Sequence, residues 1–244
     1  MMSAQRVILQ EGLGDNKKEG TMERHFDEEL AELKKKLSRT ASLVREMISA
    51  SIDALKERKE DLMKFVLDSE EKVNMSQIEI DDEALKLIAL RQPAASDLRL
   101  IVSVMKMNSE LERMADLAVN IVERSKELLK EPPLKPLIDL PRMADIAQGM
   151  LDNALQAFLN RDADTARQVC QTDDSVDDLN DQIFRELLTY MLQDPKNINR
   201  AIKLILVARY LERIADHATN IAEDVYYIIK GKDIRHHIEN NKSL

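Results

Sequence analysis

Apolar residues return every three or four positions along most of this 244-residue chain, as they do on one face of an α-helix. Leu30, Leu33 and Leu37 show this spacing in the first third of the chain. Prolines interrupt the pattern at 93, between 132 and 141, and at 195. Because proline breaks a helix interior, the pattern predicts six long helices, over about 23–57, 61–91, 96–130, 139–160, 163–192 and 197–230.

The two halves of the chain repeat. The segment LERMADLAVNI at 111–121 matches LERIADHATNI at 211–221 at most positions, and Glu70–Asn74 lines up with Asp173–Asp177. The repeat predicts an all-α fold of two tandem three-helix bundles, residues 22–131 and 142–231, joined by a proline-rich linker at 132–141. Residues 1–21, which hold three of the five glycines, are expected to form a disordered leader, and 232–244 a C-terminal tail.

Both repeats carry carboxylates at helical spacing, Glu112 with Asp116 and Glu212 with Asp216. A spacing of four residues places each pair on one helix face, where like charges repel. One interpretation is a solvated face on which neighbouring arginines and lysines supply the counter-charge. The other is a binding site for a cation, which would remove the repulsion.

The helix hairpins that turn at Pro93 and Pro195 bring further oxygen-bearing side chains level with these pairs. All-oxygen clusters suit hard ions such as Mg²⁺, Mn²⁺ or iron. Since the second half offers four carboxylates and the first only three, the second is expected to bind such an ion more tightly. His217 points about 100° away from Asp216 on the helix and is not expected to be a ligand. The candidate ligands are Glu70, Asn74, Glu112 and Asp116 in the first half, and Asp173, Asp177, Glu212 and Asp216 in the second.

Composition narrows the function. A net charge of −9 argues against a protein that coats nucleic acid. The lone Cys170 excludes an intramolecular disulfide and fits a cytoplasmic location. There is no glycine-rich phosphate loop and no evident catalytic triad, which favours a binding or regulatory module over an enzyme. Arg91, Arg99 and Lys106 surround the start of the third helix, and they are either a partner-binding patch or ordinary solubilising charge.

Several of these segments resemble the PhoU family of bacterial phosphate-uptake regulators. They are Arg91-Gln92-Pro93, Ser96-Asp97-Leu98-Arg99, LERMADLAVNI and LERIADHATNIAEDV, within a similarity that runs from about residue 24 to 235. One departure is that Ala115 and Ala215 stand where the family commonly has Gly.

The resemblance implies a pair of three-helix bundles, a homodimer, and metal binding by the two duplicated carboxylate motifs. It also implies a cytoplasmic negative regulator of the phosphate-starvation response. Such a protein would link the ATPase of the phosphate ABC transporter with the sensor histidine kinase PhoR, and would reach the membrane only through these partners. Two alternatives use the same carboxylates: a metal-dependent phosphoester hydrolase, and a metal-storage or purely structural bundle.

Overall fold

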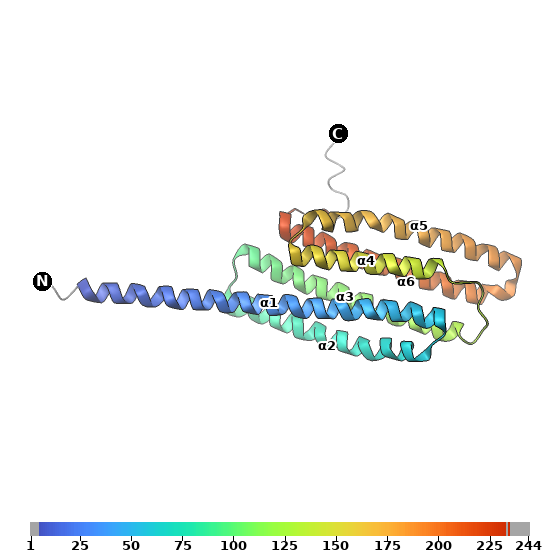
Figure 1. Ribbon diagram of the computed structural model, residues 1–244, viewed down its shortest axis with the longest axis horizontal. Helices are drawn as coiled ribbons and strands as arrows, with labels where there is room; N and C mark the ends of the chain where they lie inside the picture. The colour runs from blue at the N-terminus through green and yellow to red at the C-terminus, as the bar shows by residue number, and fades with distance from the viewer. Residues whose placement is uncertain (1–4, 233, 235–244) are drawn as a thin grey trace, which may run out of the picture.

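The computed structural model describes the backbone of residues 5–232 and 234, and the side chains of residues 25–232 and 234. Figure 1 shows long, nearly parallel and antiparallel helices connected by short turns and one longer linker. In chain order the helices are α1 (Gln5–Glu57), α2 (Glu60–Arg91), α3 (Ala95–Leu128), α4 (Asp139–Asn160), α5 (Ala163–Gln193), the short 3-10 helix η1 (Pro195–Asn197) and α6 (Ile198–Lys230).

The helix ends lie where the sequence places its breaks. Pro93 follows the end of α2, and Pro195 begins η1 directly before α6. Asp162 caps α5, because its carboxylate accepts hydrogen bonds from the backbone N–H groups of Asp164 and Thr165 (3.0 and 3.1 Å). Five of the six predicted helices therefore agree with the structure to within about two residues at each end.

Two boundaries differ from the prediction. The backbone is helical from Gln5, so the expected disordered leader is wrong for residues 5–21, and residues 1–4 lie outside the described residues. The glycines of this segment lower helix propensity by about 1 kcal/mol each, but only proline forbids a helix interior. The linker also ends at residue 138 instead of 141, since Pro141 lies in the first turn of α4, where its missing N–H costs no hydrogen bond.

The predicted pair of three-helix bundles is confirmed. Helices α1–α3 pack on one another, as do α4–α6. The two bundles also lie side by side, because α3 packs along α6 as extensively as helices within one bundle do, and α1 contacts α4 (Figure 1). Fully buried residues of α3 and α6, such as Leu111, Ala115, Leu211 and Ala215, contribute to one continuous apolar core. No helix of the described chain is both long and apolar enough to cross a membrane.

Candidate metal centres

The first carboxylate cluster forms between α2 and α3. The side-chain amide of Asn74 donates to Glu70 Oε1 (2.7 Å), while the Asn74 carbonyl oxygen is buried and has no partner among the described residues. Burial and then the charge of Asp116 raise the pKa of Glu112. Burial and then the charge of Glu70 raise the pKa of Asp116. These mutual effects show that the hairpin brings the predicted carboxylates of the two helices to one place.

The second cluster forms in the same way between α5 and α6. Burial, followed by the charges of Asp216 and Asp177, raises the pKa of Asp173 from 3.8 to about 6. Burial and Asp216 also raise the pKa of Asp177. Burial raises the pKa of Glu212 although it forms an ion pair with Arg209 (2.6 Å). Asp216 and Asp177 therefore lie close enough to act on both Asp173 and Glu212, and the pKa values of Asp173, Asp177 and Glu212 are all raised.

The two clusters lie at one level along the contact between α3 and α6. The antiparallel register of these helices is set by Lys106 with Asp224 (3.4 Å) and by Glu110 with His217 (2.6 Å). In this register the Glu112 turn of α3 lies opposite the Asp216 turn of α6. The internal repeat therefore becomes an approximate two-fold arrangement, with one cluster belonging to each bundle.

The donor types of the two clusters suit a hard cation, although the present spacing of the described side chains does not form a closed site. The donors are carboxylate and amide oxygens, and the buried Asn74 carbonyl oxygen has no competing hydrogen bond among the described residues. Among the described side chains, no three His, Cys, Asp or Glu groups already stand at ligand spacing for an ion. Binding would therefore need rotation of these side chains, and in the second cluster release of Glu212 from Arg209. The bound ion would supply positive charge that offsets the carboxylate repulsion.

A polar network between the bundles was missed by sequence reasoning. Glu110 on α3 contacts His217 Nδ1 (2.6 Å) and accepts a hydrogen bond from the Asn220 amide (3.0 Å), both on α6. His217 is buried, and it is directed to Glu110 and not into the Asp173 cluster. A signal did exist for the histidine, because His217 stands where the first copy has Leu117, within a segment of the repeat that matches at most positions. Departures from a repeat mark positions where its two copies meet different neighbours.

The three basic residues around the start of α3 all have partners within the chain; Arg91 ends α2, and Arg99 and Lys106 lie in α3. Arg91 forms a two-point ion pair with Glu29 (2.8 and 2.9 Å), and Arg99 stacks over the Tyr227 ring at 5.3 Å. Lys106 pairs with Asp224 across the bundle interface. Each therefore has a structural role of its own, and a partner-binding role for them stays a prediction.

Burial, followed by the charges of Glu223 and Asp173, raises the pKa of the Cys170 thiol to about 11. The thiol is therefore protonated near neutral pH, and a protonated thiol is a poor nucleophile.

Comparison with known proteins gives the relationship directly. The PhoU domain family matches residues 37–125 and 140–225, one copy in each bundle. A protein of Aquifex aeolicus named phosphate-specific transport system accessory protein PhoU homolog is 41% identical over 208 residues, covering 85% of this chain and 94% of that protein. The crystal structure of PhoU from Pseudomonas aeruginosa superposes with a TM-score of 0.82 at 37% identity, over 85% of this chain and all of that one.

A second crystal structure, the phosphate transport system regulatory protein PhoU from Streptococcus pneumoniae, superposes with a TM-score of 0.77 at 28% identity, over 85% of this chain and 98% of that one. Sequence family, relatives and fold agree over both bundles, and the chain belongs to the PhoU family.

Proposed function

We propose that this protein is a cytoplasmic negative regulator of phosphate uptake and of the phosphate-starvation response. It would act as an adaptor between the ATPase of the phosphate ABC transporter and a sensor histidine kinase of the PhoR type, and would function as a homodimer. Relatives named as accessory proteins of phosphate-specific transport support this role. The observation that carries the proposal is the duplicated carboxylate cluster, built once in each half of a chain whose family is regulatory.

The clusters would be hard-metal sites, for Mg²⁺, Mn²⁺ or iron. Glu70, Asn74, Glu112 and Asp116 would hold one ion or ion group, and Asp173, Asp177, Glu212 and Asp216 the other. Each cluster joins two helices of one hairpin, α2 with α3 or α5 with α6. Occupancy would therefore tie the two helices of a hairpin together and reduce the negative charge on that face of the bundle. An adaptor whose surface charge depends on a bound ion can present different faces to its partners.

The cellular test uses a host whose own PhoU gene is deleted and a reporter driven by a phosphate-starvation promoter. The wild-type chain should repress the reporter in phosphate-rich medium. The double variant Asp173→Asn/Asp216→Asn should lose repression, and Asp178→Asn, on an exposed site of α5, should keep it. Failure of the wild-type chain to repress would contradict the regulatory role, and full repression by the double variant would contradict the role of the second cluster.

The adaptor role is tested by pull-down of the purified kinase and transporter ATPase. Arg91→Glu should weaken capture if Arg91 contacts a partner, but it also breaks the pair with Glu29. The exchanged variant Arg91→Glu/Glu29→Arg restores that internal pair with the charges reversed. Weak capture by both variants would support a direct contact, whereas recovery in the exchanged variant would assign Arg91 a structural role only.

An enzymatic alternative rests on one feature of the second cluster. A carboxyl group with a pKa of about 6, beside other carboxyl groups, is a familiar arrangement for acid–base chemistry. A phosphoester hydrolase should turn over p-nitrophenyl phosphate with Mn²⁺ or Mg²⁺ and lose that activity in Asp173→Asn. An adaptor should show no turnover under the same conditions.

A further inference from the structure

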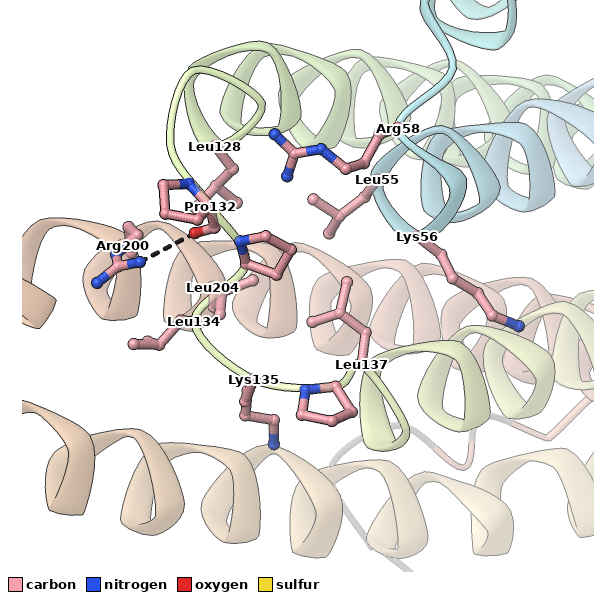
Figure 2. A pocket seen from close by; sticks show the side chains of 12 residues that line it. Leu55, Lys56, Arg58, Leu128, Pro132, Leu134, Lys135, Leu137, Arg200 and Leu204 are labelled. Carbon is pink, nitrogen blue, oxygen red and sulfur yellow. Dashed lines mark hydrogen bonds between the residues drawn. The ribbon is translucent and has the colours of Figure 1, made fainter.

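A cavity of about 200 Å³ lies where the proline-rich linker crosses the ends of the two bundles (Figure 2). Its wall is largely apolar. Leu55 of α1, Leu128 of α3 and Leu204 of α6 meet Leu134 and Leu137 of the linker around it. The cavity therefore touches both bundles and the segment that connects them.

The linker holds the cavity open. Its prolines have a fixed φ angle, so the segment cannot fold freely onto the leucines below it. Arg58 donates to the backbone carbonyls of Leu129 and Glu131, and Arg200 donates to the carbonyl of Pro132 (2.9 Å; Figure 2). Arg58 adopts a left-handed φ of 59° in the turn after α1, a conformation that glycine would reach at lower cost. An arginine at this position provides a side chain that fixes the linker.

The charge around the cavity is one-sided. Four cations line it, namely Lys56, Arg58, Lys135 and Arg200, and none of the described lining residues is acidic. This is notable in a chain with a net charge of −9. Lys135 pairs with Asp139 and Glu186, and Arg200 pairs with Glu131. Lys56 makes no hydrogen bond or ion pair with the described residues, and in Figure 2 its flexible side chain starts at the cavity edge and extends away from the cavity.

We propose that this cavity binds a small amphipathic anion, a carboxylate that carries a short alkyl or aromatic body. An apolar cavity of about 150 Å³ can hold benzene, so this one can take a body of about six to eight carbons. The carboxylate would then lie at the rim, where Lys56 is available. Such a ligand would contact α1, α3, α6 and the linker together, and would stabilise the joint between the bundles by mass action. The proposal is independent of the role in phosphate regulation.

The test is calorimetric titration of the full-length protein with three probes. Octanoate has both features of the proposed ligand, octanol has only the apolar body, and inorganic phosphate has only the charge. We expect saturable binding of octanoate, binding of octanol weaker by about fivefold or more, and no binding of phosphate at this site. The leucine methyl NMR signals of Leu134 and Leu204 should shift with octanoate. Equal binding of octanol, displacement of octanoate by phosphate, or no saturable octanoate binding would overturn the proposal.

Variants locate the binding site. Lys56→Met should weaken octanoate binding about fivefold. The matched control is Lys86→Met, which changes an exposed lysine of α2. Lys86 lies about 40 Å along this helix from its first residue, Glu60, which follows the turn next to the cavity, so this variant should leave binding unchanged. Leu134→Trp fills the cavity and should abolish binding. If this variant unfolds at a lower temperature than the wild type, Leu137→Phe serves as a second variant that blocks the cavity. Undiminished octanoate binding in a folded blocking variant would show that the ligand binds elsewhere.

Discussion

Replacing Asp173 with asparagine should stabilise the metal-free protein near neutral pH. The side chain keeps its size but loses the charge that burial, Asp216 and Asp177 make unfavourable. The difference between an ordinary pKa of 3.8 and the native value of about 6 corresponds to about 3 kcal/mol of unfolding free energy. The site is half-buried and screened by water, so we expect a gain of about 1–2 kcal/mol.

The sign of the pH dependence follows from the same values. The folded-state pKa of Asp173 lies above its unfolded value, so its ionisation costs stability, and this cost grows as pH rises from about 4 to about 6. The stabilisation by Asp173→Asn should therefore be full at about pH 7.5 and small at about pH 4.

Urea unfolding followed by circular dichroism, with a chelator present, measures the effect at both pH values. Asp178→Asn, an exposed aspartate on the same helix, is the matched control and should change stability little at either pH. A loss of stability in Asp173→Asn near neutral pH, or an equal gain at both pH values, would refute the reasoning.

Two further outcomes are expected. In calorimetric titration with Mn²⁺, Asp216→Asn should lose the tighter binding step and Asp116→Asn the weaker one, because four carboxylates attract a divalent ion more strongly than three. The opposite result would show that the first cluster is the tighter site. His217→Leu should lower the free energy of unfolding by about 1–3 kcal/mol, because Glu110 stays partly buried between the bundles with a partner removed. Adding Glu110→Gln to His217→Leu should recover part of that loss in thermal unfolding, and no recovery would show that the loss of the Glu110–His217 contact is not the cause.

Local chemistry explains why the sequence predicts so much of the cluster geometry. Pro93 and Pro195 fix where two hairpins turn, and an antiparallel hairpin then has only one level at which Glu70 can meet Asp116, or Asp173 meet Asp216. The rotation of each helix about its axis follows from its apolar stripe, which must face the core. Level and rotation together bring the carboxylates of each hairpin into one cluster.

The N-terminal helix shows where local signals mislead. Three glycines between residues 12 and 20 suggested a disordered leader, but the helix runs through them from Gln5. Glycine only lowers helix propensity, whereas proline removes a backbone donor and adds a steric clash. The two residue types therefore differ in how firmly they mark a helix boundary.

The six helices, their pairing into two bundles and the residues that gather in each carboxylate cluster can be predicted without coordinates, because they depend on contacts within one helix or between helices joined by a short turn. How the bundles lie against each other depends on long-range packing. The contact of α3 with α6 joins residues about a hundred positions apart, such as Glu110 and His217, through complementary surfaces and not through a periodic pattern. The pairing of Arg91, Arg99 and Lys106 within the chain, and the cavity under the linker, depend on that same packing.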